Sequence, residues 1–162
     1  MTIVWVHGLE GSPTGHKATR LRELGFELIS PDGRGKPLAD RVVGVQAALD
    51  QHPGALLVGS SYGGLASCWI ASQRPLAGVL LLAPALHHSE PPVAKASALT
   101  IPETTPAIVL HGTDDTIVPI EVSRKLAARC PHVQLRELAD GHSLSGSIDA
   151  IAEAIRDLGG GR

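Results

Sequence analysis

The chain has 162 residues, of which 43% are hydrophobic and 19% charged, and its formal net charge is −2. This length favours one domain spanning residues 1–162, which is long enough to bury roughly 70% of the surface that the unfolded chain exposes. A charge so close to zero provides no basic surface for nucleic acid or anionic lipid, so we expect neither as a partner.

The N-terminal sequence MTIVWVHG has neither the basic leader nor the long apolar core of a signal peptide. No apolar run reaches the roughly 18 residues that a membrane-spanning helix needs. Cys68 and Cys130 both fall in helical patterns, which favours two reduced, structural thiols over a disulfide. We therefore expect a cytoplasmic protein without a membrane span.

Apolar runs alternate with helical patterns along the chain. In chain order, we expect a strand at 2–6, a helix at 14–24, a strand at 26–29, a helix at 40–50, a strand at 55–58, a helix at 62–73, strands at 78–82 and 107–110, a helix at 119–129, a strand at 133–138 and a helix at 145–158. Gly25 and Gly159 are expected to end the first and the last helix. Strands that are apolar on both faces are typical of a parallel sheet covered by helices on both sides, so the pattern predicts a doubly wound α/β fold.

The segment Gly59-Ser60-Ser61-Tyr62-Gly63 joins a buried strand directly to a helix. A nucleophile on such a sharp turn needs glycine two residues before it and two residues after it, because side chains there would clash with the strand and the helix. Ser61 meets this requirement, and Ser60 is not centred between the glycines. Ser61 is therefore the candidate nucleophile.

A serine nucleophile needs a base, and the base needs an acid that orients it. After Ser61, the segment HGTDDTIVP follows the fifth strand and the segment DGHSL follows the sixth. Both lie at the carboxyl ends of strands, where ligands bind in open α/β sheets. We expect Asp115 as the acid, in preference to Asp114 because of its spacing from Val118, and His142 as the base.

The loop HGLEGSPTGHK after the first strand is rich in glycine and is placed to aim a backbone amide at the same point. The N–H groups of Leu9 and Tyr62 are expected to form an oxyanion hole. His7 and His111 each precede a glycine at a strand end. We expect both to be structural, because histidines often anchor turns through hydrogen bonds.

Two other readings of the chain fit less well. A phosphate-binding loop with Lys17 as its lysine would require glycine where His16 stands and serine or threonine where Ala18 stands. Adjacent His87 and His88 point apart, and no cluster of cysteines or carboxylates completes a zinc site. We expect no nucleotide and no metal.

The order of the motifs HGLEGSP, GSSYGG, HGTDDTIVP and DGH resembles the α/β-hydrolase superfamily and, within it, the small YqiA-like serine esterases. This resemblance covers nearly the whole chain. It implies Ser61, Asp115 and His142 as a catalytic triad that cleaves carboxylic esters or thioesters without a cofactor. We expect a minimal sheet of about six mostly parallel strands in the order 2-1-3-4-5-6, with no large cap domain.

The expected function is a serine hydrolase that cleaves esters of small or short-chain acyl groups through an acyl-enzyme. Two alternatives stay open: a non-catalytic relative that binds a partner protein, and an acyltransferase or perhydrolase with the same triad. Residues 83–106 interrupt the alternation of strands and helices, and long loops in compact domains are usually functional or disordered. We expect residues 84–105 to line the acyl or alcohol pocket.

Overall fold

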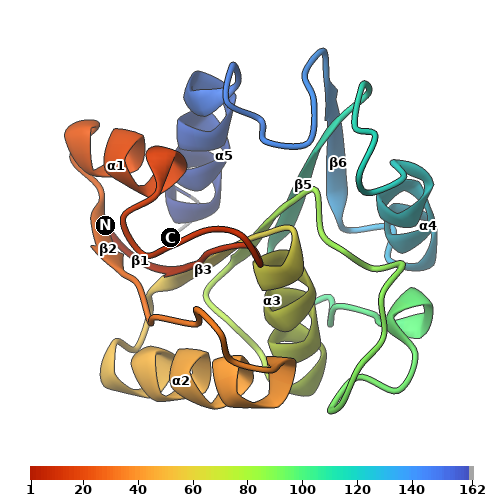
Figure 1. Ribbon diagram of the computed structural model, residues 1–162, viewed down its shortest axis with the longest axis horizontal. Coiled ribbons are helices and arrows are strands. Elements are labelled where there is room, and N and C mark those ends of the chain that lie inside the picture. The colour runs from red at the N-terminus through yellow and green to blue at the C-terminus, as the bar shows by residue number, and fades with distance from the viewer. Residues whose placement is uncertain (161–162) are drawn as a thin grey trace.

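Six parallel strands form one sheet with helices on both faces (Figure 1) in the computed structural model, which describes residues 1–160. The strands are β1 (Thr2–Val6), β2 (Glu27–Ile29), β3 (Leu56–Ser60), β4 (Val79–Leu82), β5 (Ala107–Gly112) and β6 (Gln134–Leu138). The helices are α1 (His16–Glu23), α2 (Leu38–Gln51), α3 (Tyr62–Gln73), α4 (Glu121–Arg129) and α5 (Ile148–Gly160), with a short 3₁₀ helix, η1 (Ala96–Ala98).

The strand order is β2-β1-β3-β4-β5-β6, and every neighbouring pair is parallel. The predicted order is thus confirmed. The direction of winding reverses between β1 and β3, whose carboxyl ends lie side by side because Val6 pairs with Gly59. The loops that leave these two strands therefore flank one crevice, which is where open α/β sheets bind ligands.

The sheet separates two apolar cores. Helices α1 and α5 cover one face, and α2, α3 and α4 cover the other (Figure 1). Side chains of β1 alternate between the cores: Val4 packs under α2 and α3, whereas Ile3 and Trp5 pack under α1 and α5. This double burial explains why the central strands read as continuous apolar runs.

Most strands and helices begin and end within two residues of the expected positions. Helix α5 begins later than expected because the Asp140 carboxylate accepts hydrogen bonds from Gly146 N–H at 3.0 Å and from Ser147 Oγ at 2.7 Å, which hold that segment in a turn. Gly25, with φ of 88°, follows α1 as expected. The expectation that Gly159 ends α5 is wrong, since α5 includes this residue.

The segment between β4 and β5 folds back onto the sheet. It contains η1, and its side chains Val93, Leu99 and Ile101 are buried in the core that lies under α2, α3 and α4. The buried apolar residues of this segment therefore serve packing. In residues 1–160, none of the helices combines the length and the apolar character needed to cross a bilayer.

Candidate active site

Ser61 lies on the sharp turn between β3 and α3. Its backbone has φ 55° and ψ −113°, a conformation rare for a residue with a side chain. A Cβ on Gly59 would lie 2.2 Å from Ser67 Oγ, and one on Gly63 would lie 2.2 Å from the Val6 carbonyl oxygen. Both glycines are required by these close approaches, as the sequence pattern indicated.

The hydroxyl of Ser61 faces the imidazole of His142, which comes from the loop between β6 and α5. Ser61 Oγ lies 3.0 Å from His142 Nε2, and His142 Nδ1 lies 2.8 Å from Asp115 Oδ2. A carboxylate can only accept, so Nδ1 carries the proton and Nε2 accepts the serine hydroxyl. The structure thus brings the three expected residues together, whereas Ser60 is buried and Asp114 is exposed.

The Asp115 carboxylate is fully buried and strongly hydrogen-bonded. Its Oδ1 accepts the N–H groups of Ile117 and Val118, both at 2.8 Å, and its Oδ2 also lies 3.2 Å from His111 Nε2. Burial alone would raise the pKa of Asp115, but the hydrogen bonds from His142 and from the two amides outweigh it and leave the pKa below its ordinary value. Asp115 therefore stays ionised opposite His142.

The loop after β1 is fixed by hydrogen bonds to the carbonyl group of Gly8. The Gly8 carbonyl oxygen accepts hydrogen bonds from His7 Nδ1 at 2.8 Å, Gly11 N–H at 3.2 Å and Arg41 Nη1 at 3.3 Å. The C=O and N–H of a trans peptide point in opposite directions, so these bonds aim the Leu9 N–H away from them. The Tyr62 N–H is the first amide of α3, where a helix leaves its donors without intrahelical acceptors.

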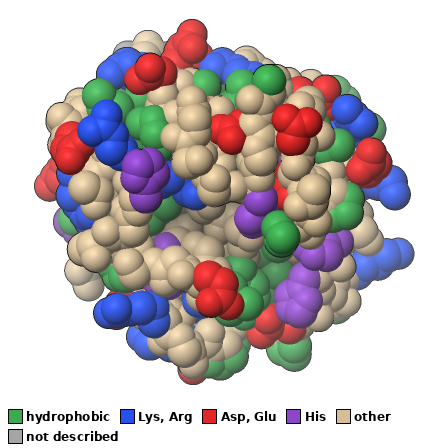
Figure 2. Space-filling view, turned by 45° about the horizontal axis from the view of Figure 1, so that its top comes forward, with side chains coloured by type: hydrophobic (Ala, Val, Ile, Leu, Met, Phe, Trp, Pro, Cys, Tyr) green, Lys and Arg blue, Asp and Glu red, His purple; other side chains and the backbone are tan. Residues whose placement is uncertain are grey.

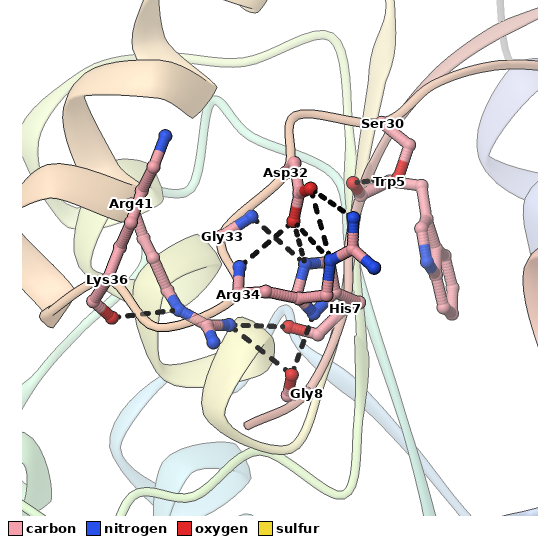
Figure 3. A network of polar contacts seen from close by, with 9 residues as sticks. All are labelled: Trp5, His7, Gly8, Ser30, Asp32, Gly33, Arg34, Lys36 and Arg41. Carbon is pink, nitrogen blue, oxygen red and sulfur yellow. Dashed lines mark hydrogen bonds and ion pairs between the residues drawn. The ribbon is translucent and has the colours of Figure 1, made fainter. Parts of the chain in front are cut away.

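His7 anchors this loop through both of its ring nitrogens, and Figure 3 shows its contacts. The ring is 3% exposed, and its Nε2 accepts the Gly33 N–H at 3.0 Å, so the proton on Nδ1 is the one donated to Gly8. Burial lowers the pKa of His7 below 6.5, which keeps the imidazole neutral. Arg41 adds a second anchor, since its Nη1 donates to the His7 carbonyl oxygen at 3.0 Å (Figure 3).

Arg41 also joins the loop after β1 to the turn that carries Ser61. Its side chain is buried, and the guanidinium carbon lies 4.7 Å from the centre of the Tyr62 ring. The Tyr62 hydroxyl in turn donates to Glu90 Oε1 at 2.6 Å. Burial, together with this hydrogen bond to a carboxylate, raises the pKa of Tyr62 to about 12. The two residues with candidate oxyanion amides, Leu9 and Tyr62, therefore share one supporting network.

A cleft of about 980 Å³ opens directly over Ser61 and His142. In Figure 2 it is seen as a hollow with histidine side chains around it. Its rim carries two strongly exposed apolar side chains, Leu9 and Ile117. From the segment between β4 and β5, only residues of 85–90 line the cleft, so the expectation for the whole of 84–105 was too broad.

Sequence reasoning missed three residues that surround this site: Arg41, Glu90 and Lys17. The helical period of the sequence could have indicated that Arg41 is buried, because it lies on the same buried stripe of α2 as Leu38 and Val45. Glu90 and Lys17 left no such signal, since no motif marks their contacts and their partners Tyr62 and Ser143 are far away in sequence. His7 and His111 do anchor turns, as expected, but each also contacts a group of the candidate site directly.

Comparisons with known proteins identify the family and the fold. The profile of the serine hydrolase family matches residues 3–145. A search of curated protein sequences found no match. Similar solved structures include mouse alpha/beta hydrolase domain-containing protein 10, with a TM-score of 0.79 and 23% identity over 97% of this chain and 88% of that chain.

Two further solved structures have the same fold. A hydrolase of the alpha/beta superfamily from Xanthomonas campestris pv. campestris has a TM-score of 0.78 and 21% identity, over 99% of both chains. The Paleococcus ferrophilus monoacylglycerol lipase has a TM-score of 0.75 and 20% identity, over 97% of this chain and 94% of that chain. The fold is therefore that of the α/β hydrolases, and the chain belongs to the serine hydrolase family.

Proposed function

We propose that this hydrolase cleaves carboxylic esters with small or short-chain acyl groups, using Ser61 as the nucleophile, His142 as the base and Asp115 as the orienting acid. The observation that carries the proposal is the unbroken series of hydrogen bonds from Ser61 Oγ through His142 to Asp115, at 3.0 and 2.8 Å, at the base of an open cleft.

The reaction proceeds in two acyl transfers. His142 Nε2 takes the proton of the Ser61 hydroxyl as Oγ attacks the ester carbonyl carbon. The protonated imidazole is stabilised by the Asp115 carboxylate and then gives its proton to the oxygen of the departing alcohol. Water then attacks the acyl-serine with the same assistance, which releases the acid and restores Ser61. These steps use no metal and no other cofactor.

The negative charge that develops on the carbonyl oxygen needs fixed donors. The N–H groups of Leu9 and Tyr62 are the candidates, because one belongs to a peptide whose carbonyl is anchored on its other side and the other opens α3. Donors fixed in advance lose no energy to reorientation as the charge forms. Loss of one such donor typically lowers the rate about 100- to 1,000-fold.

The cleft favours a modest apolar acyl group. Leu9 and Ile117 present apolar surface at the rim, and Val118 and Ala85 add further apolar lining. The similarity to a monoacylglycerol lipase supports ester chemistry in general. Cytoplasmic location stays a prediction from the sequence, and a small ester is the proposed partner.

A fluorophosphonate probe tests the assignment of the nucleophile, because it forms a covalent bond only with an activated serine. We expect labelling of the wild-type chain, labelling of Ser60→Ala and none of Ser61→Ala. The two variants remove neighbouring hydroxyls from the same turn, so they form a matched pair. Labelling that survives in Ser61→Ala would refute the proposal. In the wild type, rates of hydrolysis of p-nitrophenyl esters of rising chain length measure the acyl preference.

A further inference from the structure

Lys17 extends from α1 to the cleft and contacts the residue that follows His142. Its Nζ donates a hydrogen bond of 2.7 Å to the carbonyl oxygen of Ser143, and both residues line the cleft. Ser143 follows His142 directly in the chain. The ammonium group is therefore held on the His142 side of Ser61.

The Lys17 ammonium has few hydrogen-bond and ion-pair partners. An ammonium has three N–H donors, and one of them is used by Ser143. Within residues 1–160, no carboxylate lies within ion-pair distance of Lys17. Asp140 attracts Lys17, but its oxygens accept hydrogen bonds from Gly141 N–H, Gly146 N–H and the Ser147 hydroxyl. Burial lowers the pKa of Lys17, so an added negative charge would be favourable here.

The other charges of the cleft do not neutralise Lys17. Two carboxylates line the cleft, Glu10 and Glu90. Glu90 accepts hydrogen bonds from Tyr62 and His88, and Glu10 is exposed. Lys17 is also the only lysine or arginine among the described residues that line the cleft. One positive charge matches a singly charged carboxylate better than a doubly charged phosphate.

We propose that Lys17 binds a carboxylate carried by the alcohol part of the substrate. This inference rests on the proposed ester hydrolysis, because it places the alcohol by the proton that His142 gives to it. His142 must protonate the departing oxygen, so the alcohol lies beside His142, where Lys17 presents its free N–H groups. The substrate class is then an ester of a hydroxy acid, with a short acyl group over Ser61 and the acid group at Lys17.

Two acetyl esters test this assignment in the whole chain. 4-Acetoxybenzoate carries a carboxylate on its alcohol part, and 4-acetoxybenzamide replaces the carboxylate with a neutral amide of similar size. We expect the wild type to prefer the benzoate about tenfold in kcat/KM, a size typical of a hydrogen bond to a charged group. The ratio should fall to about one in Lys17→Met, remain in Lys17→Arg and remain in Lys125→Met, which removes an exposed lysine outside the cleft.

Lys17 could instead serve only to hold the loop that carries His142. That role predicts an equal loss of rate on both esters in Lys17→Met, with an unchanged ratio, and such a result would overturn the inference.

Binding measured without turnover separates the inference from the ester proposal. Ser61→Ala should bind 4-hydroxybenzoate about tenfold more tightly than 4-hydroxybenzamide in an NMR titration, and the preference should vanish when Lys17→Met is added. Equal binding of the two ligands refutes the carboxylate site whether or not esters are cleaved. If Ser61→Ala binds 4-hydroxybenzoate preferentially but the wild type cleaves neither ester, the carboxylate site is supported and only ester hydrolysis is refuted.

Discussion

Replacing Ser61 with glycine should abolish hydrolysis and should give a more stable fold than replacing it with alanine. The backbone at Ser61 has φ 55° and ψ −113°, which glycine adopts freely and a residue with a Cβ adopts at a cost of about 1–3 kcal/mol. Glycine also gives the unfolded chain more freedom, which offsets about 0.4–1 kcal/mol of this relief. The net gain in the free energy of unfolding, relative to alanine at the same position, is about 1 kcal/mol.

Ser61→Ala is the matched control because both variants lose the hydrogen bond between Ser61 Oγ and His142 Nε2. The difference between them therefore isolates the backbone strain. Denaturant titration should show a higher midpoint for Ser61→Gly at an unchanged slope, and thermal unfolding should show a midpoint about 2–4 °C higher for a chain of this size.

The same pair of substitutions at an unstrained helical position should have the opposite effect. Ser67 lies in the middle of α3, where glycine is less stable than alanine by roughly 0.5–1 kcal/mol. Ser61→Gly should therefore be more stable than Ser61→Ala, while Ser67→Gly should be less stable than Ser67→Ala. Equal signs at the two positions would refute the argument that the turn stores strain.

Three further outcomes follow from the supporting contacts. Asp115→Asn should lower kcat about 10,000-fold, because an amide in this place favours the wrong tautomer of His142; steady-state kinetics on a p-nitrophenyl ester measures this. Arg41→Met removes the hydrogen bonds to the His7 and Gly8 carbonyls, so it should loosen the loop after β1 and lower kcat roughly 10- to 100-fold with little change in KM; a raised KM with unchanged kcat would refute a role in orienting the oxyanion donors. His7 has a lowered pKa in the folded chain, so the unfolded chain binds the proton more tightly and stability should fall as the pH drops below about 6.5; denaturation of His7→Asn should lack this part of the pH dependence.

Local rules were sufficient to predict the strands and to place the candidate reacting groups close to one another. The glycines around Ser61 are required by contacts within one turn, and the acid and base follow strand ends whose positions the apolar runs define. Parallel strands bring their carboxyl ends to one edge, so Asp115 and His142 could be placed near Ser61 without coordinates. The contacts of the ionisable residues around the site could not be predicted in this way. The helical period indicates that Arg41 is buried, but no period or motif indicates that it contacts Gly8.

The segment between β4 and β5 shows how composition can mislead. Its prolines and small residues indicated a loop, which suggested a pocket wall. Its apolar residues Val93, Leu99 and Ile101 instead fill the core under α2, α3 and α4, so that only residues near His87 reach the cleft. Composition alone does not distinguish apolar residues that face a ligand from those that face the sheet, because both positions favour the same residue types.

The two His-Gly pairs at the ends of β1 and β5 have closely similar roles. An imidazole carries two nitrogen atoms on opposite sides of a rigid ring, and each can form a hydrogen bond. His7 uses them to join the Gly8 carbonyl to the Gly33 amide, and His111 joins the Val118 carbonyl to the Ser123 hydroxyl. Each ring thus fixes the loop that follows its strand, one loop carrying a candidate oxyanion amide and the other carrying the carboxylate opposite His142. The same dipeptide therefore recurs where two strands each hold a loop steady beside the candidate nucleophile Ser61.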